Sequence, residues 1–188
     1  MFFLLAISAL TEAQTLAYED RYRDTTDWPG IELKLRLSCS MANTATEATT
    51  GMSATTHQAQ QLLEQAPVMT AGIAAHTILI AFEHEGKISH DDWETIIIRV
   101  GKINDDALRI FHALDLRVSA SHDAIELLLN YPPRRLRRHE RKEVVGLCVD
   151  TQLQLLHALV DMERSIRVVN DELLGLRHEI LSHAPLQP

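Results

Sequence analysis

The sequence predicts an all-α fold, an elongated antiparallel bundle of three main helices that follows an irregular N-terminal segment. Glycine and proline are scarce, with 7 and 6 residues in 188, and aromatic residues make up 5%. Leu, Ile, Val and Ala alternate with charged residues after residue 55, a composition that favours helix over sheet. Apolar residues there recur at spacings of three and four, the period of a helix with one buried face. One domain with a single core is therefore expected.

Residues 1–54 are expected to be poorly structured and to act as a linker. The sequence DWPG at 27–30 favours a turn. Alternating apolar residues over 31–37 fit one strand, which lacks a partner strand to bond its backbone. The Thr-, Ala- and Ser-rich tract 38–56 is typical of a linker.

The chain opens with the apolar run MFFLLAISAL, which resembles the core of a secretory signal but has no basic residue before it. The run is also shorter than the roughly 20 apolar residues that span a bilayer. We therefore expect no transmembrane segment and a cytoplasmic protein, with secretion as the alternative. Met41 and Met52 offer later start codons, so residues 1–40 need not belong to the native protein.

The first helix is expected from Thr55 to Glu83, with an interruption at Pro67, which fits the first turn of a new helix. Its buried face is predicted from a 4-3-4 spacing of four residues: Met69, Ile73, His76 and Ile80.

The second helix is expected from Ser89 to about Asn130. The hydroxyl of Ser89 can cap it, with Asp91 and Asp92 at its positive end. A break is predicted near Ser119, where the spacing falters. Its buried seam alternates spacings of three and four residues: Trp93, Ile96, Val100, Ile103, Ala107, Ile110 and Leu114.

The third helix, from Arg134 to His183, carries the strongest periodic signal and is coiled-coil-like; residues 184–188 are expected to be a disordered tail. At 1.5 Å per residue it would measure roughly 75 Å. Its seam runs at three- and four-residue spacing: Val145, Cys148, Gln152, Leu155, Leu159, Met162, Ile166, Val169, Leu173, Leu176 and Ile180.

This helix is expected to be longer than the other two, so its C-terminal part should expose an apolar seam that needs a partner. The predicted partner is a second copy of the chain or another helical protein. The predicted partner-binding residues are Leu159, Met162, Ile166, Val169, Leu173, Leu176 and Ile180.

Six cations open the third helix: Arg134, Arg135, Arg137, Arg138, Arg141 and Lys142. Cations oppose the helix dipole at this end. Either solvent and acidic residues of the second helix compensate them, or they bind an anion on nucleic acid, an acidic protein or lipid headgroups. Because the net charge is -8, a polyanion could bind only at such a local patch.

Within this run, Arg134 and His139 have the spacing R-x4-H. The pair resembles the short signature of the HEPN ribonucleases, an all-α family whose arginine and histidine flank the scissile phosphate at a dimer interface. The resemblance covers these two residues, and Arg135 stands where the family favours a small polar residue. It implies a further alternative, an RNA-cleaving enzyme that uses Arg134 and His139.

Metal binding is not expected. The stretch Ala81–Asp92 resembles an EF-hand loop around Gly86, but Ala81 lacks the carboxylate of its first position and Asp92 the glutamate of its twelfth. A helix–turn–helix connection accounts for the same residues. Ten histidines are scattered and lack the three or four convergent ligands of a zinc site, so structural or surface roles are predicted.

Two cysteines, Cys39 and Cys148, are too few for a disulfide framework and favour a reducing compartment. Cys148, His76, Gln152 and Trp93 lie at seam positions, so we expect an inert buried thiol and core side chains there. The sequence contains no Gly-rich phosphate loop, nucleophile elbow or paired-carboxylate signature. It therefore predicts a non-enzymatic interaction or scaffold module without a cofactor.

Overall fold

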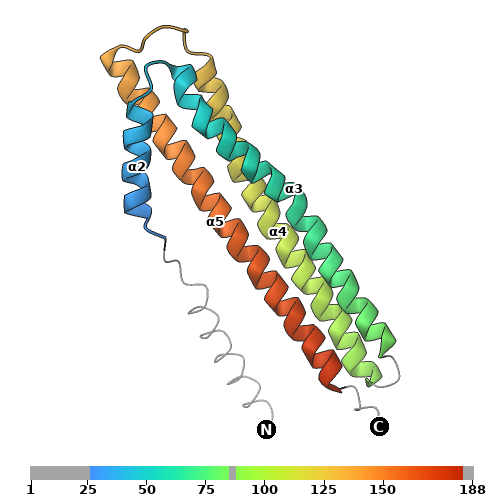
Figure 1. Ribbon diagram of the computed structural model, residues 1–188. Coiled ribbons are helices and arrows are strands. Elements are labelled where there is room, and N and C mark those ends of the chain that lie inside the picture. Colours follow the sequence, from blue (N-terminus) through green and yellow to red (C-terminus); the bar gives the residue numbers. More distant parts are fainter. Residues whose placement is uncertain (1–25, 85–87, 184–188) are drawn as a thin grey trace, which may run out of the picture. The chain divides into compact units, whose positions relative to one another are not determined.

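Four α-helices make up the regular structure in the computed structural model, which describes residues 26–84 and 88–183. They are α2 (Trp28–Ser40), α3 (Ala45–Glu83), α4 (His90–Leu129) and α5 (Arg138–His183) (Figure 1). The described ranges contain no β-strand, and the predicted all-α class is confirmed. The chain divides into two compact units, residues 1–31 and 32–188. The second unit holds α3, α4, α5 and the end of α2.

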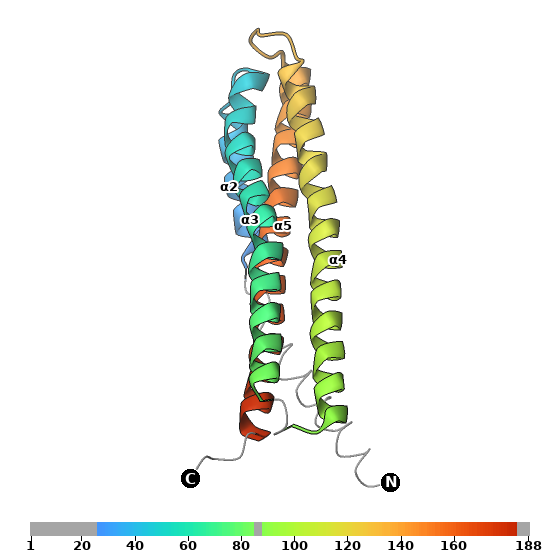
Figure 2. The same ribbon diagram turned by 90° about the vertical axis from the view of Figure 1, so that its right-hand side faces the viewer.

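The bundle of the second unit consists of α3, α4 and α5, each of which packs against both of the others. Figure 1 and Figure 2 show α4 running antiparallel to α3 and α5. The three helices have 39, 40 and 46 residues, which corresponds to lengths of about 60 to 70 Å. They are therefore well matched in length.

Side chains cap the first turns of α3 and α4. Thr44 Oγ1 accepts a hydrogen bond from the backbone nitrogen of Glu47 at 3.1 Å, and Glu47 accepts one from that of Asn43 at 2.6 Å. Ser89 Oγ accepts from the nitrogen of Asp92 at 3.1 Å. The predicted cap of the second helix is confirmed.

Small side chains form the buried face of α3, which differs from the predicted one. Met69 and His76 are exposed, so the predicted face is wrong by one residue, a rotation of about 100°. Large residues suggested that face, but close packing of the three helices favours small ones at the contact. The buried residues of α3 are Ala45, Ala48, Thr49, Met52, Thr56, Ala59, Ala66, Thr70, Ala74, Thr77, Ile80 and Ala81.

Two helices continue through breaks that the sequence predicted. Helix α3 passes through Pro67, whose missing N–H leaves the Leu63 carbonyl without its usual helical partner. Helix α4 passes Ser119 without a break. Its buried Ser121 is no cap, because its hydroxyl donates to the Val118 carbonyl one turn earlier.

Residues 28–54 are ordered, so their predicted irregular structure is wrong. Alternating apolar residues over 31–37 lie in α2, and the expected linker 38–56 forms the end of α2 and the first third of α3. The capping pattern of Thr44 and Glu47 is a sequence signal for this helix start. Residues 1–25 and the expected tail 184–188 lie outside the described ranges.

Two clusters of buried apolar side chains form the core. One, around Val100, Met162 and Leu173, lies between the C-terminal part of α3, α4 and α5. The other, around Met52, Leu128 and Cys148, lies where the connections α2–α3 and α4–α5 meet. In that second cluster, the backbone nitrogen of Leu136 donates to the Asn43 carbonyl at 3.0 Å. The two connections therefore lie side by side.

Candidate functional site

The predicted partner-binding seam of α5 lies in the core of its own chain. Met162, Val169, Leu173, Leu176 and Ile180 are each at most 3% exposed, and Leu159 and Ile166 are half-buried against the same cluster. As a surface for a partner, this prediction is wrong. The reason lies in the neighbouring helices: α3 starts ten residues earlier than expected and α4 is unbroken, so both extend along α5.

An apolar surface does exist, on the side of α3 that faces away from the bundle. We define the outer face of α3 by six exposed residues: Val68, Met69, Gly72, Ala75, Leu79 and Phe82. Val68 is 72% exposed and Leu79 58%. Residues 65–82 contain no Asp, Glu, Lys or Arg, and α3 as a whole contains no Lys or Arg. Exposed large apolar residues of α4, such as Ile98 and Leu116, stand among charged neighbours.

Two helices are long and apolar enough to cross a membrane by length and composition. These are α3, with a mean hydropathy of 1.4, and residues Arg138–Ser182 of α5, with 1.2. In each case 33% of the apolar window is buried. Core helices of soluble proteins pass the same test, so the absence of a transmembrane segment stays a prediction. In α3 the unburied part of the window includes the outer face.

The six cations of the basic cluster surround the connection α4–α5 and the first turn of α5. Helix α5 begins at Arg138 and not at Arg134, so Arg134, Arg135 and Arg137 precede the helix. All six side chains are at least partly exposed. The structure therefore places these residues together at one end of the bundle.

Glu140 organises part of this cluster. It accepts a hydrogen bond from Arg134 Nη2 at 2.8 Å and another from the backbone nitrogen of Arg137 at 2.7 Å. The bond from Arg137, followed by the positive charges of Arg134 and His139, lowers the pKa of Glu140 despite some desolvation. Because Arg134 lies outside the helix and is paired, it does not have the helical R-x4-H geometry implied by the resemblance to HEPN ribonucleases.

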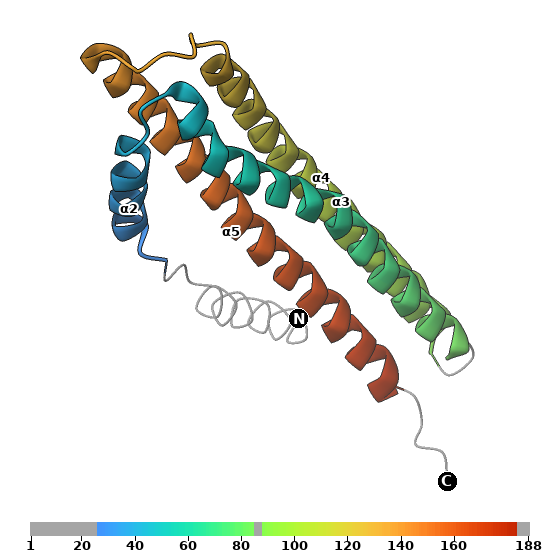
Figure 3. The same cartoon turned by 45° about the horizontal axis from the view of Figure 1, so that its top comes forward.

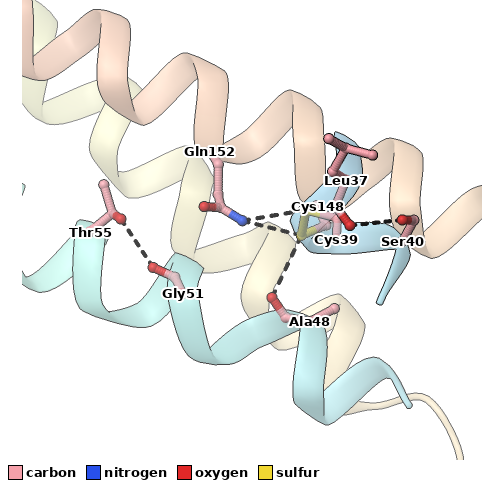
Figure 4. Close-up of a disulfide and its surroundings, with 8 residues drawn as sticks. All are labelled: Leu37, Cys39, Ser40, Ala48, Gly51, Thr55, Cys148 and Gln152. Atoms are coloured by element: carbon pink, nitrogen blue, oxygen red, sulfur yellow. Dashed lines mark hydrogen bonds between the residues drawn. A yellow bond between two sulfur atoms is a disulfide. The ribbon is translucent and has the colours of Figure 1, made fainter. Parts of the chain in front are cut away.

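A disulfide joins Cys39 of α2 to Cys148 of α5 (Figure 4). The expected free thiol at Cys148 is therefore wrong. The Cα atoms are 6.2 Å apart, within the range that a disulfide spans, and both residues are buried. The amide nitrogen of Gln152 lies 3.4 Å from Cys39 Sγ and 3.2 Å from Cys148 Sγ. Gln152 is thus a core residue, as predicted, and it holds its position beside the bridge.

An open groove of about 370 Å³ lies between α3 and α4. Its lining combines apolar and ionisable side chains: Gln60, Leu63, Glu64, Pro67, Leu108, Phe111, His112 and Asp115. Two carboxylates give the groove a negative character. The free carbonyl of Leu63 adds a hydrogen-bond acceptor near it.

The histidines do not converge. His122 Nε2 lies 2.6 Å from Gln60 Nε2, and His57 pairs with Gln61 one turn along α3. Among the described residues, no group of three or more His, Cys, Asp or Glu is placed to hold a metal ion. The centre of the stretch that resembles an EF-hand, residues 85–87, lies outside the described ranges.

No family model matches the chain, and neither curated proteins nor solved structures include a match. The class that fold and surface define is an all-α antiparallel bundle of three long helices, with a further helix joined to it by a disulfide.

Proposed function

We propose that this chain is a non-enzymatic helical interaction module that self-associates through the outer face of α3. The observation that carries the proposal is the exposure of a charge-free apolar face over residues 65–82. Exposed apolar patches of this kind, unlike single apolar residues, mark interaction surfaces.

A second copy of the chain is the partner that this face fits best. In an antiparallel pair with its two-fold axis between Ile73 and Ala74, Val68 of one copy lies opposite Leu79 of the other. Gly72 then lies opposite Ala75, so the centre of the contact is small and the backbones can approach. A two-fold contact requires such a self-complementary surface.

The charges of α3 argue against an anionic partner at this face. The helix has no Lys or Arg, whereas helices that lie on membranes are rich in both. A contact made by one helix pair is smaller than a standard interface of about 1,600 Å². We therefore expect a reversible dimer whose population depends on concentration.

Sedimentation velocity over a concentration series tests this proposal. Gly72→Glu is expected to abolish self-association, and Gly101→Glu on α4 is its matched control. Both glycines are exposed inside helices, and a side chain added at either has no neighbour within 4 Å. The two variants carry the same net charge and should have similar stability.

A monomer at every concentration, or equal loss of association in both variants, would refute the proposal. A competing occupant is the apolar N-terminal segment of the same chain. If that segment covers the face, the full chain is monomeric and deletion of residues 1–25 produces the dimer, which also overturns self-association of the intact protein.

A further inference from the structure

We propose that the end of the bundle formed by the connections α2–α3 and α4–α5 docks on an anionic lipid surface. This proposal is independent of the outer face of α3, because it concerns other residues and another partner. It depends on three features of this end: free cations, neutralised acids and exposed apolar side chains.

The cations are available. Arg135, Arg138 and Lys142 are exposed, and none of the three side chains makes an ion pair or hydrogen bond with another residue in the described part of the chain. Arg134 is the member that pairs, with Glu140. A positive surface thus remains even though the net charge of the chain is -8.

The neighbouring acids are held by internal contacts. Glu140 bonds to Arg134 and to the backbone of Arg137. Glu143 accepts a hydrogen bond from the Tyr131 hydroxyl at 3.4 Å, and Glu47 accepts one from the backbone of Asn43. Desolvation, followed by the charge of Glu143, raises the pKa of Tyr131, which keeps that phenol neutral. These contacts leave the positive charges dominant at this end.

Apolar side chains are exposed beside the cations. Met41, in the connection α2–α3, is 79% exposed and Leu129, the last residue of α4, is 52% exposed. Pro132 and Pro133 are also exposed. The hydrogen bond from Leu136 to Asn43 joins the two connections, which lie at one end of the bundle in Figure 3.

This combination favours a lipid surface over nucleic acid. Apolar residues that enter the boundary between headgroups and acyl chains, surrounded by Lys and Arg at headgroup level, are typical of peripheral membrane contacts. Single-stranded nucleic acid instead needs aromatic side chains for base stacking. The aromatic residue of this end, Tyr131, donates its hydroxyl to Glu143.

Flotation of the full chain with vesicles tests the proposal. We expect binding to phosphatidylcholine vesicles that contain phosphatidylglycerol, little binding to phosphatidylcholine alone, and release by salt. Each cation near such a surface contributes about fivefold to partitioning, so the triple variant Arg135→Glu, Arg138→Glu, Lys142→Glu should bind at least about a hundredfold more weakly. Met41→Ser should weaken binding several-fold, because it removes apolar contact with unchanged charge.

The matched control is Lys34→Glu, Lys102→Glu, Arg109→Glu, which changes the net charge equally with exposed residues outside the cluster. It should bind the mixed vesicles within about threefold of the unaltered chain. Equal loss in both triple variants, no binding to the mixed vesicles, or unchanged binding by Met41→Ser would overturn the proposal. So would polyuridylate binding at physiological salt that depends on the cluster, combined with no binding to vesicles. Binding of the unaltered chain and of Met41→Ser decides the matter even if a triple variant fails to fold.

Discussion

Adjacent residues of α5 have opposite environments, and the seam that the sequence predicts separates them correctly. Leu173 is 0% exposed and Leu174 is 51% exposed. The three- and four-residue spacing identified Leu173 as a buried position, but it could not say whether its neighbours belong to the same chain or to a partner. The structure assigns them to α3 and α4.

Leu173→Ala should lower the free energy of unfolding by about 2–5 kcal/mol, because it leaves a cavity in the core. Leu174→Ala, the matched control, should change it by no more than about 0.5 kcal/mol. Urea denaturation measures both. Equal and small effects would mean that the C-terminal half of α5 is not packed in the monomer.

A second prediction concerns Glu140, whose pKa is lowered by the backbone bond from Arg137 and by nearby positive charges. A carboxyl group with a lowered folded-state pKa stabilises the fold above its unfolded-state pKa, and this contribution is lost as the pH falls through the folded-state pKa. Glu140→Gln should therefore lower the melting temperature at neutral pH and leave it nearly unchanged in strong acid. A pH-independent difference would show that the negative charge does not matter.

At the scale of elements, the ends of helices were predicted better than their faces. Ser89 caps α4 as its sequence context predicts. The face of α3 was misassigned because large apolar residues were expected inside, whereas the close contacts of this helix need Ala and Thr. The hydroxyls of Thr56 and Thr77 remain satisfied there, since each donates to the carbonyl one turn earlier.

Pro67 gives the sharpest test of α3 as one helix. A proline inside a helix costs about 3 kcal/mol relative to alanine, so Pro67→Ala should stabilise the protein by up to that amount. The substitution restores an N–H that can donate to the Leu63 carbonyl. Thermal and urea unfolding measure the gain. A neutral or destabilising effect would indicate that the chain needs an interruption at this position.

For the molecule as a whole, the disulfide has the largest reach, because Cys39 and Cys148 are 109 residues apart. It ties the end of α2 to α5 beside a small cluster of buried side chains. Structural disulfides persist in oxidising compartments, which bears on the predicted cytoplasmic location and on the secretory alternative.

Reduction of this bond should lower the free energy of unfolding by up to about 4–5 kcal/mol, because a long closed loop restricts the unfolded chain. Urea unfolding with and without reductant measures the change, and the variant Cys39→Ala, Cys148→Ala should not respond to reductant. Two titratable thiols in the denatured, unreduced protein would contradict the bond.

The sequence by itself determined the helical class, the number of main helices in the bundle, the cap of α4 and the buried stripe of α5, because each depends on residues close together along the chain. It also located the basic cluster. Tertiary structure alone decided what covers the stripe of α5, which face of α3 remains exposed, and that Cys39 meets Cys148. Those outcomes depend on contacts between residues far apart in the chain, where the relative lengths of the helices and the size of each side chain at a contact decide the packing.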